Sequence, residues 1–129
     1  MTLLLLITSA LAGPAVPTDA VESFILAGDS QDVPALEAVL HKDFRVVAQM
    51  PDGVSVMPRS QYISLIRGGK IGGVPRTTVF DVVMHSGDLA TVKGRLDSSA
   101  AHFDCTWTLA RGDRGWQVIQ DAVAFSPKS

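Results

Sequence analysis

Hydrophobic residues recur at intervals of three and four positions in the first third of the chain, which is the spacing of amphipathic helices. They form two groups: Val21, Phe24 and Ile25, then Val33, Leu36, Val39 and Leu40. Residues 28–32 separate the groups with turn residues, and Thr18 or Asp19 and then Asp32 are suitable N-caps. The pattern predicts two short helices, the first beginning near Thr18.

The period changes to two after residue 43. Apolar Phe44, Val46 and Ala48 alternate with their neighbours, and Pro-Asp-Gly at 51–53 predicts a turn into a second strand over 54–57. Pro58 opens a third helical segment, whose largely apolar stripe ends at the glycines of positions 68 and 69. We therefore expect a hairpin followed by a third helix.

The second half of the chain predicts four antiparallel strands, over 77–85, 89–98, 101–111 and 115–125, joined by turns at 86–88 and 112–115. One alternating face carries Ala90, Val92, Gly94, Leu96, Phe103, Cys105, Trp107, Leu109, Trp116 and Val118. The strand over 77–85 is apolar on both faces, so we expect a homodimer to cover the outer side of the sheet. The order predicts an α+β fold, with about three helices on the concave face of a curved antiparallel sheet.

The first twelve residues are uncharged and apolar and end in a small-x-small pattern, which predicts a secretory leader. Against this, no Lys or Arg stands in the leader, so an apolar first helix or a wrongly assigned start is the alternative. The run is too short to span a bilayer. We expect one domain over 18–126, exported if the leader is cleaved and cytoplasmic otherwise, with no stable membrane insertion.

Composition narrows the function classes. The 129 residues are 47% hydrophobic, enough for one core, and the formal net charge of −2 disfavours a nucleic-acid partner. The lone Cys105 cannot form an intramolecular disulfide, and the three histidines have no metal-ligand spacing. We expect neither a metal nor another cofactor.

Three segments together resemble a known superfamily: D-V-P-A-L-E-A-V-L-H-K-D-F at 32–44, G-D-L-A-T-V at 87–92 and G-W-Q-V-I at 115–119. Over residues 21–125 the chain resembles the nuclear transport factor 2-like (NTF2-like) proteins, in particular the SnoaL-like, putative lumazine-binding group. The resemblance implies a cone-shaped α+β barrel with a pocket between helices and concave sheet, and dimerisation through the convex face. It implies no single activity, because the superfold hosts isomerases, dehydratases, hydrolases and binding modules.

Gln120 is the most informative polar residue of the predicted interior. It keeps phase with Trp116 and Val118, so we expect its amide to point into the pocket, where it needs a hydrogen-bond partner. That partner is a bound ligand or, alternatively, Tyr62, a backbone group or water. The other pocket candidates, which can equally be plain core residues, are Phe24, Met57, Tyr62, Cys105 and Trp107.

Acid–base chemistry has few candidate residues. A ketosteroid-isomerase type of reaction needs a carboxylate base and a Tyr or protonated Asp as donor. Tyr62 is the only tyrosine, and Asp104 is out of phase with the inner face. Asp81 and His85 share one face by alternation, and they form an acid–base pair only if that face points inward. Buried Cys105 is expected to stay protonated and to behave as a small hydrophobe.

The glycine-rich stretch 67–75 lacks the order of a phosphate-binding loop and follows a helix rather than a strand. We expect a mobile connection at the mouth of the cone, where Arg67, Lys70 and Arg76 add positive charge that would attract an anionic ligand. The favoured function is binding of a small apolar or aromatic molecule without catalysis. The alternatives are a pocket enzyme of isomerase or dehydratase type and a structural dimer with a vestigial cavity.

Overall fold

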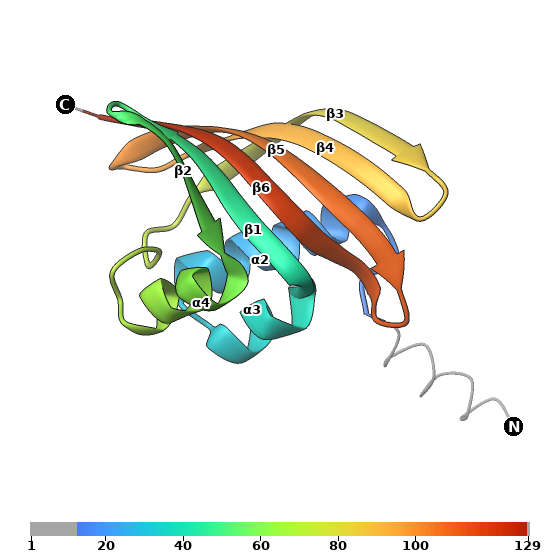
Figure 1. Ribbon diagram of the computed structural model, residues 1–129. Coiled ribbons are helices and arrows are strands. Elements are labelled where there is room, and N and C mark those ends of the chain that lie inside the picture. The colour runs from blue at the N-terminus through green and yellow to red at the C-terminus, as the bar shows by residue number, and fades with distance from the viewer. Residues whose placement is uncertain (1–12, 129) are drawn as a thin grey trace, which may run out of the picture.

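A curved sheet wraps over three helices in the computed structural model, which describes residues 13–128 (Figure 1). The elements follow the chain in the order α2 (Pro17–Ser30), α3 (Val33–Val39), β1 (Leu40–Met50), β2 (Gly53–Pro58), α4 (Arg59–Arg67), β3 (Thr77–Ser86), β4 (Leu89–Asp97), β5 (Ala101–Gly112) and β6 (Gly115–Pro127). All three helices lie on the concave side. The predicted α+β class, with three helices on one face of a curved sheet, is confirmed.

The six strands are arranged in the order β2-β1-β6-β5-β4-β3. Every neighbouring pair is antiparallel except β1 and β6, which run parallel, with Val46 beside Asp121. The sheet is therefore mixed, and the prediction that it is antiparallel throughout is wrong. Hairpin turns mark antiparallel pairs in a sequence, whereas β1 meets β6 across about half the chain, with no local signal.

Capping residues account for the helix boundaries. The Asp32 side chain accepts a hydrogen bond from the Ala35 N–H at 3.2 Å, which confirms it as the N-cap of α3. The first helix begins earlier than predicted: Val16 is its N-cap and Pro17 its first residue. Thr18 and Asp19 therefore lie inside the helix. Gln31, in the left-handed conformation at φ 54°, ends α2.

The core lies between the helices and the inner face of the sheet. Leu36, Trp107 and Val118 are completely buried, as the alternation predicts. Gly94 makes room for the Trp107 indole, because a Cβ at that position would lie 3.1 Å from the ring and 2.8 Å from the Val79 carbonyl oxygen. The inner face therefore admits little change of volume at this point.

The predicted leader, residues 1–12, lies outside the described residues. From residue 13 to residue 128, no helix has both the length and the apolar character that crossing a membrane requires.

Candidate functional site

A bulge in β6 decides which of its polar residues faces the helices. Val118 pairs with Leu109, but Gln120 pairs with Thr108, so Ile119 is an extra residue in β6. Alternation restarts after the bulge, and Gln120 lies on the outer face. There its Oε1 accepts a hydrogen bond from Arg45 Nε at 2.7 Å in an exposed position. The prediction that Gln120 points into the interior is wrong, because counting by twos cannot detect a bulge.

Asp121 takes the inner position that the bulge removes from Gln120. It pairs with Trp107 on β5 and with Val46 on β1, and both of these side chains are buried on the inner face. The carboxylate oxygen Oδ1 of Asp121 is buried and has no hydrogen-bond partner among the described residues. A carboxylate held in this way lacks the compensation that buried charges normally receive.

Burial shifts the protonation of this carboxyl group. Loss of solvation raises the pKa of Asp121 to about 7, and the Arg76 guanidinium opposes that rise only in part. Asp121 therefore exchanges its proton near neutral pH. Below that pH it is a neutral hydrogen-bond donor, and above it an anion whose Oδ1 is buried.

The indole of Trp107 adds a second polar group without a partner. Its Nε1 is buried and donates no hydrogen bond to any described residue, and Trp107 lies directly across the ladder from Asp121. An unpartnered donor and an unpartnered acceptor are therefore at neighbouring positions of one face. Native proteins seldom leave such groups unpaired, which makes this the strongest indication of a missing partner in the described chain.

Tyr62 extends from α4 toward the same region. Its ring packs against Phe44 at 5.4 Å and against Phe24 at 6.0 Å between centroids. Burial, and secondarily the Asp121 carboxylate, raise the pKa of the Tyr62 phenol above its usual range. The phenol therefore stays protonated and remains a hydrogen-bond donor.

Arg76 and Asp29 form a shielded ion pair at this end of the cone. Arg76 Nε lies 2.7 Å from Asp29 Oδ1, and the Arg76 backbone N–H donates to Oδ2 at 3.1 Å. The guanidinium also lies over the Phe103 ring, 5.1 Å from its centroid. A Cβ on Gly28 would lie 3.5 Å from Arg76 Nη2 and 3.7 Å from Tyr62 Oη, so both groups approach the same point of α2.

The glycine-rich connection after α4 packs against the end of α2. Gly73 N–H donates to the Gly28 carbonyl at 3.1 Å, and Gln31 Nε2 donates to the Ile71 carbonyl at 3.2 Å. Gly72 has a φ of 78°, and a Cβ there would lie 2.5 Å from the Gly28 oxygen, so only glycine fits. Two of the three cations expected to add positive charge here lie near carboxylates: Arg76 is 2.7 Å from Asp29, and Arg67 is 3.9 Å from Glu37.

Five of the six predicted pocket residues lie on the inner side of the sheet, and one does not. Phe24, Met57, Tyr62, Cys105 and Trp107 pack on the inner side, whereas Gln120 does not. Cys105 is buried as expected; burial, followed by the Asp121 carboxylate, raises the pKa of its thiol and keeps it protonated.

The other acid–base candidates lie apart from this cluster. A second bulge, between Phe80 and Val82, turns Asp81 to the outer face, where it pairs with Arg95 at 3.2 Å. The His85 ring lies 5.0 Å from the Trp116 ring between centroids, nearly perpendicular to it, and His85 remains solvent-exposed. Asp81 and His85 therefore form no pair, and the expectation that they share a face is wrong. Asp104 faces away from the interior, as predicted, opposite Arg95.

Asp121, the residue around which the cluster forms, is not among the residues that the sequence pattern predicts for the site. One signal was present: Asp121 is the only acidic residue between positions 115 and 129, and the four residues that follow it are all apolar. A charge placed in this way indicates either an edge position or a buried functional group.

The fold defines the class of protein. It is NTF2-like, similar to an NTF2-like protein of unknown function from Silicibacter pomeroyi, with 19% identity, a TM-score of 0.72, and coverage of 86% of this chain and 92% of that one. A ketosteroid isomerase-like protein from Erwinia carotovora atroseptica matches with 16% identity, a TM-score of 0.69, and 85% and 93% coverage. An NTF2-like protein from Shewanella baltica matches with 13% identity, a TM-score of 0.74, and 86% and 91% coverage.

The family follows from the sequence itself. The chain belongs to the family described as "Putative lumazine-binding", whose model matches residues 15–122. No curated protein matches the chain. The predicted superfamily is confirmed.

Proposed function

We propose that the protein binds a small, flat aromatic molecule on the inner face of its sheet, at Asp121, Trp107 and Tyr62. The observation that carries this proposal is the pair of buried, unpartnered polar atoms, Asp121 Oδ1 and Trp107 Nε1, at opposite positions of β5 and β6. A ligand with one donor and one acceptor would satisfy both groups. Removing those two deficits favours the bound state.

The surrounding side chains favour an aromatic ligand. Phe24, Phe44 and Tyr62 form a cluster of tilted rings beside the unpartnered groups, and flat heterocycles pack well against such rings. The family's description points to lumazine, whose fused rings carry N–H donors and carbonyl acceptors. This chemistry complements one acceptor on Asp121 and one donor on Trp107.

Calorimetric titration with lumazine tests the proposal, using Asp121→Asn as the variant and Gln120→Leu as the matched control on the outer face. We expect wild type and the Gln120 variant to bind alike, and the Asp121 variant to bind roughly tenfold more weakly, about 1.4 kcal/mol. Native mass spectrometry of protein isolated from cells identifies any other ligand that it carries. If neither method finds a ligand whose binding depends on Asp121, the proposal is wrong.

The protonation of Asp121 favours a second candidate function, acid–base catalysis. A carboxyl group with a pKa of about 7 can take up and release a proton at neutral pH, and the protonated phenol of Tyr62 can stabilise a developing oxyanion. The ketosteroid isomerase-like neighbour supports a test with a β,γ-unsaturated ketone. Catalysis predicts turnover with an inflection near pH 7, lost in Asp121→Asn and reduced in Tyr62→Phe. Binding without turnover supports the first function.

The outer face supports a homodimer. Val54 and Val56 on β2, and Val82 and Met84 on β3, are exposed on or beside this face, and an interface would bury them. Sedimentation at micromolar concentration should give the mass of two chains. A monomer at all concentrations up to the millimolar range counts against the dimer.

The apolar, uncharged composition of residues 1–12 supports export. Amino-terminal sequencing of the protein from its native cells should begin near residue 13. An intact Met1 would contradict cleavage.

A further inference from the structure

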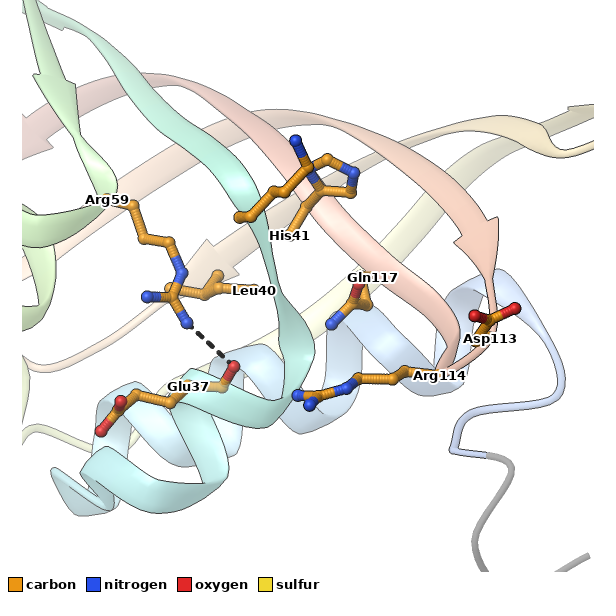
Figure 2. A pocket seen from close by; sticks show the side chains of 8 residues that line it. Glu37, Leu40, His41, Arg59, Asp113, Arg114 and Gln117 are labelled. Atoms are coloured by element: carbon orange, nitrogen blue, oxygen red, sulfur yellow. Dashed lines mark hydrogen bonds between the residues drawn. The ribbon is translucent and has the colours of Figure 1, made fainter.

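A surface cleft of about 510 Å³ lies away from the inner cluster, where the end of α3 meets the starts of β1 and α4 and the turn between β5 and β6 (Figure 2). Its lining side chains are mostly charged or polar: Glu37, Leu40, His41, Lys42, Arg59, Asp113, Arg114 and Gln117. None of these residues is part of the inner cluster, which consists of Phe24, Phe44, Tyr62, Trp107 and Asp121. The cleft is therefore a separate candidate site.

The cationic and anionic side chains of the cleft point in different directions. In Figure 2 the guanidinium groups of Arg59 and Arg114 and the amide of Gln117 extend toward one space beside Leu40, from three different elements. The carboxylates of Glu37 and Asp113 extend away from that space at its two ends. The space toward which Arg59, Arg114 and Gln117 extend is therefore lined mainly by hydrogen-bond donors.

The two arginines are not neutralised within the described chain. No carboxylate of residues 13–128 lies within 4.0 Å of Arg59 or Arg114, whereas Glu37 faces Arg67 and Lys42 faces Asp43. Residues 1–12 contain neither Asp nor Glu. Both guanidinium groups therefore keep their full positive charge toward the cleft.

Arg59 also has unused donors. Its Nη2 donates to the Glu37 carbonyl at 3.0 Å, but its Nε is buried and has no partner. Gln117 Nε2 donates to the Ala38 carbonyl at 3.0 Å. These two bonds give partners to carbonyls in the last turn of α3, and so reduce the negative charge that would repel an anion at this helix C-terminus.

We propose that this cleft binds an oxyanion, the phosphate or carboxylate group of a small metabolite, between Arg59 and Arg114. Planar guanidinium groups bind both kinds of group through paired N–H donors, which Lys cannot do in the same geometry. The volume accommodates a molecule larger than the anionic group itself. Gln117 lies beside Arg114 in Figure 2 and adds a neutral amide to the site.

The experiment uses the full chain and two probes, inorganic phosphate and citrate, each titrated at constant ionic strength in chloride and followed by amide NMR shifts. We expect saturable shifts of Arg114, Gln117 and the first turn of α4. Saturation by phosphate alone assigns a phosphate group, saturation by citrate alone assigns a carboxylate, and saturation by both assigns the shared oxyanion chemistry.

The decisive variant is Arg114→Gln, because Arg114 is exposed and makes no hydrogen bond that supports α3. It should weaken binding roughly tenfold, whereas Lys93→Gln, which removes one positive charge from the outer face, should leave binding unchanged. Arg59→Gln should also weaken binding, and its fold is checked by its melting curve. The proposal is overturned if neither probe saturates at millimolar concentration, or if the Arg114 and Lys93 variants weaken binding equally.

Discussion

Two shielded carboxylates, Asp29 and Asp121, lie at the same end of the cone, and the protein treats them in opposite ways. Asp29 receives two hydrogen bonds from Arg76, one from the backbone and one from the side chain. Asp121 has an oxygen with no partner at all, and burial raises its pKa to about 7. The satisfied carboxylate joins the loop after α4 to α2, whereas the unsatisfied one has no partner among the described residues and is the basis of the proposed binding site. In this protein the paired carboxylate supports the fold, and the unpaired carboxylate is the candidate functional group.

Breaking the satisfied pair should have the largest effect. Asp29→Ala leaves the Arg76 guanidinium shielded and unpaired, and also removes the acceptor of the Arg76 backbone N–H. We expect the free energy of unfolding to fall by about 3 kcal/mol, measured by urea denaturation. Glu22→Ala, at an exposed position of α2, is the control and should change stability by less than about 0.5 kcal/mol. If Asp29→Ala and Glu22→Ala changed stability equally, the Asp29–Arg76 pair would not stabilise the fold, and Asp29 would not differ from Asp121 in that respect.

Neutralising the Asp121 carboxylate should instead raise the free energy of unfolding. Because the folded pKa of Asp121 is about 7 and an unfolded aspartate titrates near 4, the folded state binds the extra proton between these values. Stability therefore falls as pH rises through this window, and the penalty is complete above pH 7. Asp121→Asn should stabilise the protein at pH 8 by on the order of 2 kcal/mol, and the gain should vanish below pH 4.

Thermal melts at pH 8 and pH 4 measure this difference, with Asp52→Asn in the exposed β1–β2 turn as the control. A loss of stability at pH 8 in the Asp121 variant would mean that its carboxylate has a native partner, and that it resembles Asp29 after all.

Substitution of Gln120, the residue next to Asp121, should have the smallest effect on stability. Gln120 makes an exposed hydrogen bond to Arg45, so Gln120→Leu should change the free energy of unfolding by less than about 0.5 kcal/mol. Urea denaturation measures it. A loss of 1 to 3 kcal/mol, the cost of a stranded buried partner, would place Gln120 in the interior and contradict the bulge.

The difference between these adjacent residues also shows how far the sequence alone leads. Helical spacing and alternation predict the three helices, the hairpins and the buried Leu36 and Trp107, because these depend on local periodicity. The inner and outer faces of β6 beyond Val118 depend instead on one extra residue, Ile119, which pairing with β5 reveals and composition does not. The face on which Asp81 lies likewise depends on the bulge in β3, which the sequence pattern does not reveal.

Long-range pairing is the other feature that local pattern does not carry. The parallel contact of β1 with β6 places Val46 beside Asp121, 75 positions later in the chain. Tyr62 lies on α4, Arg76 in the loop before β3 and Asp121 on β6, so their approach follows from the curvature of the sheet over the helices. Five of the six residues predicted for the interior were found there by periodicity, and the acid that they surround was not.

The titration of the Asp121 carboxyl carbon, followed by NMR in the ligand-free protein, tests the central claim most directly. Our account predicts an inflection near pH 7, and Asp52, in the exposed turn, supplies the comparison within the same sample. An inflection of Asp121 near pH 4, at the ordinary value of an aspartate, would show a solvated or paired carboxylate and would contradict the proposed site.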